Sequence, residues 1–237
     1  MHDKKIILII AAHPDDEVLG CGGSMAKWSI GGHDVHLLIM AEGATSRDRK
    51  RNRDNRKDDL SHLGKSAKEA GRVLGIKSIE LFDYPDNRMD SVDLLDIVKT
   101  IENGVEKIKP DVVVTHHCGD LNIDHQIVHK AVLTACRPQP GSTVKQILSF
   151  EVPSATEWQP STTNSPFMPN WFEDISDTLN LKLKALEAYN SEMQEWPHAR
   201  SIKALEHLAG WRGASVGVEA AEAFMLVRNI LKQERIL

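Results

Sequence analysis

His13, Asp15 and Asp16 stand directly behind an apolar run, residues 6–11. Such a short and wholly apolar run predicts a buried strand of a parallel sheet, and these sheets bind ligands beyond the carboxyl ends of their strands. His13 and Asp16 offer one nitrogen and one oxygen ligand, which suit Zn²⁺ when a third protein group and a water complete the site. Asp15 is then left beside the metal. The alternative is a polar turn in which Asp15 or Asp16 caps the following helix.

A second polar group follows another buried-strand signal, residues 111–115 with three consecutive valines, and ends in Asp124 and His125. Both groups are therefore expected at the same edge of one sheet. Asp124 is predicted to be the N-cap of a helix that His125 opens, and His129 lies one turn further along the same face. We expect His125 to be the third metal ligand. The spacing of His129 fits a further ligand, a partner of a ligand or a substrate contact.

Residues 13–17, His-Pro-Asp-Asp-Glu, together with Asp124 and His125 resemble the signature of the PIG-L/LmbE-like family of zinc-dependent N-deacetylases. Members of this family remove the acetyl group from N-acetylglucosamine units. Residues 68–75 and 211–224 are also similar to segments of the family. The resemblance implies one deacetylase domain over residues 1–237 and one Zn²⁺ per chain, or another divalent metal. It also implies His13, Asp16 and His125 as ligands and Asp15 as the general base.

The chain departs from the family at Asn122. Many members have His-Pro-Asp-His where residues 122–125 here are Asn-Ile-Asp-His. An amide can donate a hydrogen bond to an oxyanion, but it cannot act as an acid near neutral pH. The expected catalytic residues are Asn122, Asp124 and Asp15. Because Asn122 cannot donate a proton, proton donation to the leaving amine is left to Asp15, His117 or His129. The family's arginine on the helix after the second strand is also missing, with Leu63 at or near its place.

Apolar runs and helical patterns alternate along the chain. This alternation predicts an α/β fold, a single Rossmann-like domain with a mainly parallel sheet flanked by helices. Strands are expected over residues 6–11, 33–40, 78–82, 111–115, 146–150 and 224–230, and helices over 57–74, 90–108, 177–190 and 201–211.

Three other segments are candidates for substrate binding. Asp86 and Arg88 follow the third strand and are expected to bind sugar hydroxyls, although the same residue types also suit a plain turn. Residues 47–54 are rich in arginine and form either a solvated loop or a flap that meets a substrate phosphate. Residues 153–171 carry Trp158 and Trp171, which either bind substrate or pin this long loop to the core.

Composition narrows the class of protein. The net charge of −5 over 237 residues argues against a nucleic-acid partner. No stretch approaches the ~20 apolar residues of a membrane span, and the first residues lack a signal peptide, so a cytoplasmic location is expected. The three cysteines are expected to be reduced, with Cys21 and Cys118 near the site and Cys118 packed as a small buried residue. Homo-oligomerisation stays open.

Together these features predict a zinc-dependent hydrolase that removes the N-acetyl group from an amino sugar or its conjugate. The expected partner is therefore a small N-acetylated molecule. Two alternatives remain: a metal-dependent amidase of a sugar-containing conjugate, and a sugar-binding module that has lost activity. The intact Asp15 speaks against the second alternative.

Overall fold

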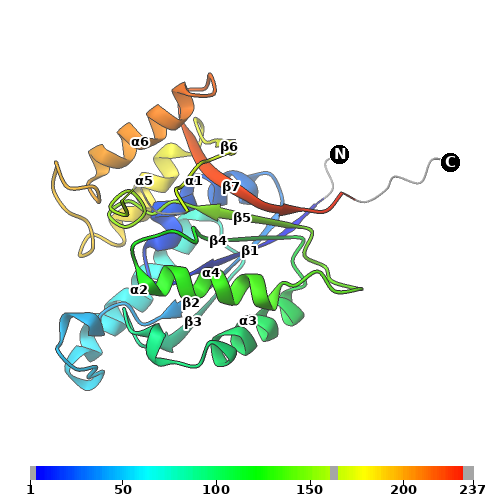
Figure 1. The fold of residues 1–237 in the computed structure, drawn as a ribbon. Helices are drawn as coiled ribbons and strands as arrows, with labels where there is room; N and C mark the ends of the chain where they lie inside the picture. Colours follow the sequence, from blue (N-terminus) through cyan, green and yellow to red (C-terminus); the bar gives the residue numbers. More distant parts are fainter. Residues whose placement is uncertain (1–3, 161–164, 232–237) are drawn as a thin grey trace.

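Parallel pairing dominates the sheet. The computed structural model describes residues 4–160 and 165–231 and shows seven strands in the order β3-β2-β1-β4-β5-β7-β6 (Figure 1). The first five strands along the chain pair in parallel, and β7 is antiparallel to both β5 and β6. The strands are β1 (Ile6–Ala11), β2 (Asp34–Ala41), β3 (Ser78–Tyr84), β4 (Val112–His116), β5 (Gln146–Phe150), β6 (Trp171–Asp174) and β7 (Ala221–Asn229).

Helices cover both faces of this sheet, as the α/β prediction required. The core on one face includes side chains of α1, α2 and α5, and the core on the other includes those of α3 and α4 (Figure 1). Ile7 and Ile9 belong to the first core, and Leu8 and Ile10 to the second, which explains why β1 is apolar throughout. The helices are α1 (Asp16–Ile30), α2 (Lys57–Leu74), α3 (Leu94–Ile108), α4 (Ile123–Ala135), α5 (Leu179–Glu187) and α6 (Ile202–Ala214).

Several predicted boundaries were wrong. The helix predicted from residue 90 begins at Leu94, because a 3₁₀ turn, Met89–Ser91, and the extended residue Val92 precede it. The helix predicted over residues 177–190 is confined to α5, and the last strand begins three residues earlier than predicted, at Ala221. No strand was predicted at β6, which is four residues long and lies at the edge of the sheet.

The order of the parallel strands creates a crevice at β1 and β4. From β1 the chain continues outward through β2 and β3, whereas β4 and β5 lie on the other side of β1. In open α/β sheets the ligand site lies where the strand order reverses in this way, beyond the carboxyl ends of the strands. The two polar groups of the sequence follow β1 and β4 and therefore reach this crevice.

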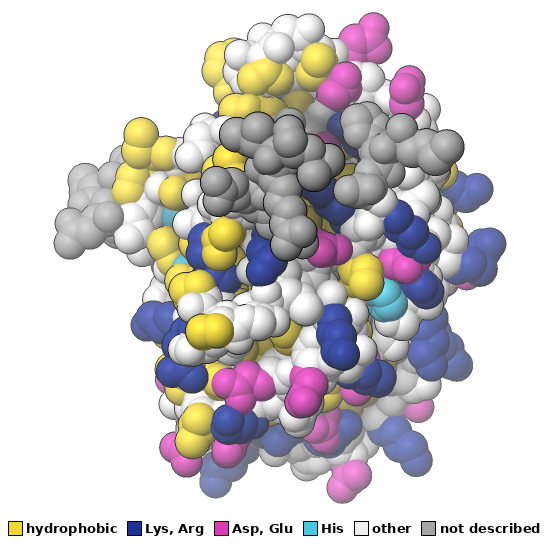
Figure 2. Space-filling model, turned by 90° about the vertical axis from the view of Figure 1, so that its right-hand side faces the viewer, with side chains coloured by type: hydrophobic (Ala, Val, Ile, Leu, Met, Phe, Trp, Pro, Cys, Tyr) yellow, Lys and Arg dark blue, Asp and Glu magenta, His cyan; other side chains and the backbone are white. Residues whose placement is uncertain are grey.

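Basic and acidic side chains of the described residues lie interspersed over the face shown in Figure 2, so its charge is mixed. None of the helices in residues 4–160 and 165–231 combines the length and apolar character needed to cross a membrane.

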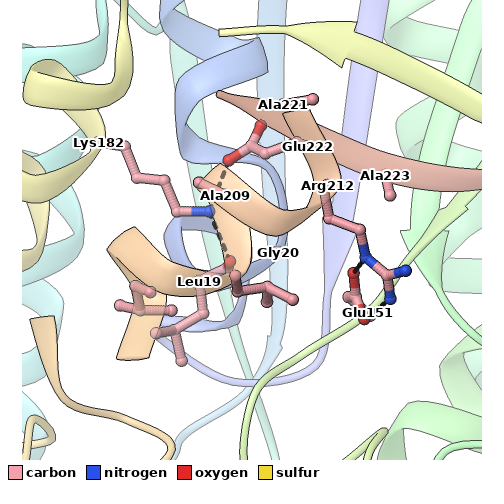
Figure 3. A pocket seen from close by; sticks show the side chains of 11 residues that line it. Leu19, Gly20, Glu151, Lys182, Ala209, Arg212, Ala221, Glu222 and Ala223 are labelled. Atoms are coloured by element: carbon pink, nitrogen blue, oxygen red, sulfur yellow. Dashed lines mark hydrogen bonds and ion pairs between the residues drawn. The ribbon is translucent and has the colours of Figure 1, made fainter. Parts of the chain in front are cut away.

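Helix α1 is kinked at Cys21, where φ is −147° and ψ is 24°. In a regular helix the Gly23 N–H would donate to the Leu19 carbonyl. Here the Gly23 N–H donates to Glu222 Oε1 over 3.0 Å, and Lys182 Nζ donates to the Leu19 carbonyl over 2.8 Å. Lys182 and Glu222 pair with each other over 2.6 Å (Figure 3). A buried ion pair therefore replaces the missing helical bond, and the kink separates the first turn of α1 from the remainder.

Candidate active site

The three predicted metal ligands converge at the crevice. His13 and Asp16 follow β1, and His125 lies in the first turn of α4, which follows β4. One ligand atom from each of the three lies within 4.8 Å of the others. All three residues are buried, so the position is shielded from bulk water. The two nitrogens and one carboxylate oxygen are the kind of set that holds Zn²⁺ with a position left open.

Unpaired polar atoms in this cluster show that a cation fits it. In the described part of the chain, Asp16 Oδ1 and both ring nitrogens of His125 are buried without a hydrogen-bond partner. His125 Nε2 lies 3.1 Å from Asp16 Oδ2 but does not form a hydrogen bond with it. Buried polar atoms are nearly always paired, so such a group is typical of a site that binds an ion.

Asp124 orients the His13 ring. Nδ1 of His13 lies 3.1 Å from Asp16 Oδ2, and Nε2 lies 3.0 Å from Asp124 Oδ2. The Asp124 carboxylate is itself held by the backbone N–H groups of Asn87 and Met89, at 2.6 and 2.9 Å. A metal-binding histidine usually donates its second ring nitrogen to a carboxylate in this way. Nδ1 of His13 is therefore the ring nitrogen that faces Asp16 within the candidate metal cluster.

A carboxylate also lies behind His125. Asp120 Oδ2 is 3.2 Å from His125 Nδ1 and accepts a hydrogen bond from Thr156 Oγ1 over 2.7 Å. His13, Asp86 and Asp124 form a second cluster with atoms close enough for a metal. Both oxygens of Asp124 accept backbone N–H groups, whereas Asp16 keeps one oxygen without a partner, so the first cluster is the better candidate.

The carboxylates favour positive charge at the histidines. Burial lowers the pKa of His13, but hydrogen bonds to Asp124 and Asp16 outweigh it and hold this pKa well above 6.5. Burial acts in the same direction on His125, whose pKa is nevertheless raised to about 9 by Asp16 and Asp120. This charge balance suits a proton or a metal ion, and metal binding at such histidines releases protons.

Asp15 stands beside the cluster in an unusual backbone conformation. Its φ is 111°, a backbone conformation that residues other than glycine rarely adopt. The Asp15 N–H donates to Glu17 Oε2 over 3.1 Å. Tyr189 donates to the other Glu17 oxygen over 2.7 Å. Burial raises the pKa of Asp15 to about 7, with Arg200 acting in the opposite direction and Asp16 in the same one. A carboxylate with a pKa near neutrality can serve as a general base.

Arg200 was not predicted to be part of the site. Its Nη1 lies 2.7 Å from Asp15 Oδ2, and its Nε donates to Ser154 Oγ over 2.7 Å. It comes from the loop before α6, far from both motifs, and no local pattern in the sequence marks it.

Asn122, not Asp124, is the N-cap of α4, so that prediction was wrong. The Asn122 side-chain oxygen accepts the Asp124 N–H over 2.9 Å, the usual contact of an N-cap residue with the first turn. Its amide nitrogen donates to Asn87 Oδ1 over 3.0 Å, which leaves the second N–H of the amide for another acceptor. Because Asn122 caps the helix, the Asp124 side chain is free to reach His13.

The predicted substrate contacts have partners within the protein. Asp86 Oδ1 lies 3.4 Å from His13 Nε2, and Asp86 Oδ2 accepts the Ser46 N–H. His129 Nδ1 lies 2.8 Å from the His116 carbonyl. Asp86 therefore lies in the site itself, and His129 lies beside the end of β4.

The Arg88 side chain binds a neighbouring loop. Its Nη2 donates to the backbone carbonyls of Asp48 and Arg49, so Arg88 anchors the arginine-rich segment. Arginines of residues 47–54 form ion pairs with carboxylates of the chain: Arg47 with Glu192, and Arg51 and Arg53 with Glu42. Arg56, just after this segment, pairs with Asp48.

Two further expectations concern exposure. Cys118 is exposed, so its predicted role as a small buried residue was wrong. Trp171 lies in β6 and packs against the core, whereas the Trp158 side chain is 52% exposed. Of these two tryptophans, only Trp158 is therefore exposed enough to contact a ligand.

His117, a predicted proton donor, has a partner in the loop that follows residue 164. The distance between His117 Nε2 and the Ser165 carbonyl oxygen is 2.9 Å.

Known proteins are similar to this chain in sequence and in fold. The model of the PIG-L family, described as GlcNAc-PI de-N-acetylase, matches residues 8–136, which contain all three candidate ligands. The uncharacterized deacetylase YaiS of Escherichia coli K12 is 31% identical over 194 residues, 79% of this chain and 92% of YaiS. The diacetylchitobiose deacetylase of Thermococcus kodakarensis is 26% identical over 248 residues, 97% of this chain and 85% of that protein.

A solved structure confirms the fold. The 4-carboxy-2-hydroxymuconate hydratase of Pseudomonas putida KT2440 aligns with a TM-score of 0.73 and 20% identity, covering 97% of this chain and 99% of that one. This likeness concerns the fold alone, because the same fold serves a different reaction there. The match over more than half of the chain and the similarity to YaiS show that the protein belongs to the PIG-L family, as its two motifs predicted.

Proposed function

We propose that this protein is a zinc-dependent hydrolase that removes the acetyl group from an N-acetylated amino sugar or a conjugate of one. The observation that carries the proposal is the buried cluster of His13, Asp16 and His125, with its unpaired atoms, next to Asp15. The deacetylase names of two relatives support the reaction, and the Thermococcus enzyme supports a sugar substrate.

A bound Zn²⁺ would lower the pKa of a coordinated water and polarise the acetyl carbonyl. Asp15 takes a proton from water as the water oxygen attacks the acetyl carbon. The carbon–nitrogen bond then breaks, and the proton passes from Asp15 to the leaving amine, so that acetate and the free amino sugar result. General acid–base catalysis of this kind contributes about 10²–10⁴ in rate.

Other residues of the chain support this chemistry. Asp124 and Asp120 orient the two histidine ligands. The second N–H of the Asn122 amide donates to the developing oxyanion. Asp86 and His129 contact the sugar, with Arg88 anchoring the loop beside it.

The test is acetate release by the full chain after metal removal, with and without added Zn²⁺. The substrates are N-acetylglucosamine free, linked to a nucleotide and linked to a lipid. Release is expected only with Zn²⁺, and His125→Ala should lose both metal and activity. Asp15→Asn should keep the metal but lose at least about 10²-fold in kcat. Asparagine is chosen because it tolerates a positive φ better than alanine does.

Asp34→Asn is the matched control, because Asp34 is a surface carboxylate paired with Lys4 and Lys77. It should leave activity and metal content unchanged. Absence of acetate from every substrate, despite one Zn²⁺ per chain, would contradict the proposal. Cleavage of larger amides would then indicate an amidase, and binding of an acetylated sugar without cleavage would indicate a binding module.

A further inference from the structure

Arg200 holds the Asp15 carboxylate from a part of the chain outside both motifs. The ion pair between Arg200 Nη1 and Asp15 Oδ2 spans 2.7 Å, and the two side chains are 24% and 3% exposed. Building on the proposed function, we propose that Arg200 is a positioning residue that fixes the Asp15 carboxylate where it accepts the proton of the attacking water.

The backbone at Asp15 explains why an external contact is needed. Its φ of 111° is a strained conformation for a residue with a side chain, and such strain persists only where surrounding contacts hold it. The N–H of Asp15 is held by Glu17. Arg200 holds the other end of the residue, its carboxylate, so Asp15 is fixed at both the backbone and the side chain.

The guanidinium group of Arg200 fixes the orientation of the Asp15 carboxylate as well as its distance. Arg200 donates through Nη1 to Asp15 and through Nε to Ser154 Oγ, which fixes the plane of the group with two bonds. With Oδ2 occupied, the other oxygen of the Asp15 carboxylate is the one that takes the proton. A lysine ammonium is a point charge without this rigid fork, so lysine cannot reproduce both contacts at once.

The loop that carries Arg200 is itself ordered by hydrogen bonds. The Arg200 N–H donates to His198 Nδ1 over 3.0 Å, and its carbonyl accepts the Gln194 N–H over 3.1 Å. Directly after it, Ser201 caps α6 by accepting the Ala204 N–H. Hydrogen bonds therefore hold the Arg200 backbone in place on both sides, in the loop before it and at the N-cap of α6 after it.

A guanidinium does not release its proton in proteins, so Arg200 is not the general acid. Its effect passes through the position of Asp15. Loss of this contact should therefore lower kcat and leave KM and metal content unchanged. Misplacement of a catalytic group by about 1 Å can cost about 10²-fold in rate, and we expect a loss of this order in Arg200→Ala.

Steady-state kinetics of the zinc-loaded full chain test this proposal. Arg200→Ala should regain part of its kcat when guanidinium chloride is added at a non-denaturing concentration, but not with sodium chloride. Arg200→Lys and Ser154→Ala should show smaller losses of kcat. Arg212→Ala is the matched control, because Arg212 forms a similarly shielded ion pair with Glu151, and its activity should be unchanged (Figure 3).

Three results would overturn the proposal: a rise in KM alone, full activity of Arg200→Ala, or loss without rescue that Arg212→Ala shares. If Arg200→Ala does not fold, full activity of both Arg200→Lys and Ser154→Ala has the same meaning. A crystal structure of Arg200→Ala tests the position of Asp15 without any substrate. An unmoved carboxylate there contradicts the proposal even if the wild type releases no acetate, which separates its failure from that of the proposed function.

Discussion

Replacing Lys182 by methionine tests how the kink in α1 is held. The Lys182 side chain is 6% exposed, donates to the Leu19 carbonyl and pairs with Glu222, which is 4% exposed. Methionine keeps most of the aliphatic volume, but it removes the positive charge that faces the buried Glu222 carboxylate and the donor of the Leu19 carbonyl, while backbone N–H groups still donate to Glu222. Removing one partner of a buried ion pair typically costs about 3–5 kcal/mol, and we expect the free energy of unfolding to fall by this amount.

Urea unfolding followed by circular dichroism measures this loss. A chain of this size loses roughly 2–4 °C in Tm per kcal/mol, so Tm in thermal unfolding should fall by about 6–20 °C. Lys99→Met is the control, because the pair of Lys99 with Glu102 is exposed on α3 and should contribute at most about 0.5 kcal/mol. A double-mutant cycle with Glu222→Gln isolates the coupling between the two charges. If Lys182→Met costs no more than Lys99→Met, the buried pair does not stabilise the kink.

Three other predictions concern separate parts of the molecule. Asn122→Ala should lose about 1 kcal/mol of stability in urea unfolding because α4 loses its cap, and its kcat should fall. A thiol reagent should modify Cys118 quickly in the native protein and reach Cys21 and Cys136 only after unfolding, since both of these are buried. Burial lowers the pKa of His36 from 6.5, so the unfolded chain binds a proton more readily and stability should fall as the pH drops below 6.5. His36→Gln should lose less stability than the wild type between about pH 7 and about pH 5, as measured by urea unfolding.

The parallel part of the sheet was predictable from the sequence because its central strands are buried on both faces. Burial on both sides leaves little place for polar residues, so β1 is a continuous apolar run and β4 begins with three valines before Thr115 and His116. The edge strand β6 lacks this signal, since its four residues are only partly buried or exposed. The start of α3 was mispredicted because it depends on a 3₁₀ turn and one extended residue, which helical periodicity does not reveal.

The site residues that follow β1 and β4 were also predictable from the sequence, whereas those from later loops were not. His13 and Asp16 follow directly after β1, and His125 lies in the first turn of α4, the helix that follows β4, so the order of strands and helices brings the three together. The contact of Arg200 with Asp15 depends on the path of a late loop over the sheet, which no local pattern encodes. The cap of α4 was assigned to Asp124 because both Asn and Asp favour that position, and the sequence alone does not decide between them.

The candidate metal ligands and the residues that hold Asp15 come from different parts of the chain. The family match covers residues 8–136 and contains every candidate metal ligand, whereas Tyr189 and Arg200 lie beyond it. Tyr189 acts on Glu17, which binds the Asp15 N–H, and Arg200 binds the Asp15 carboxylate. Residues 8–136 therefore supply the candidate metal cluster, and Tyr189 and Arg200 set the environment of the proposed base. Changes in that later segment should alter kcat without altering metal affinity, because they reach Asp15 and leave the ligands in place.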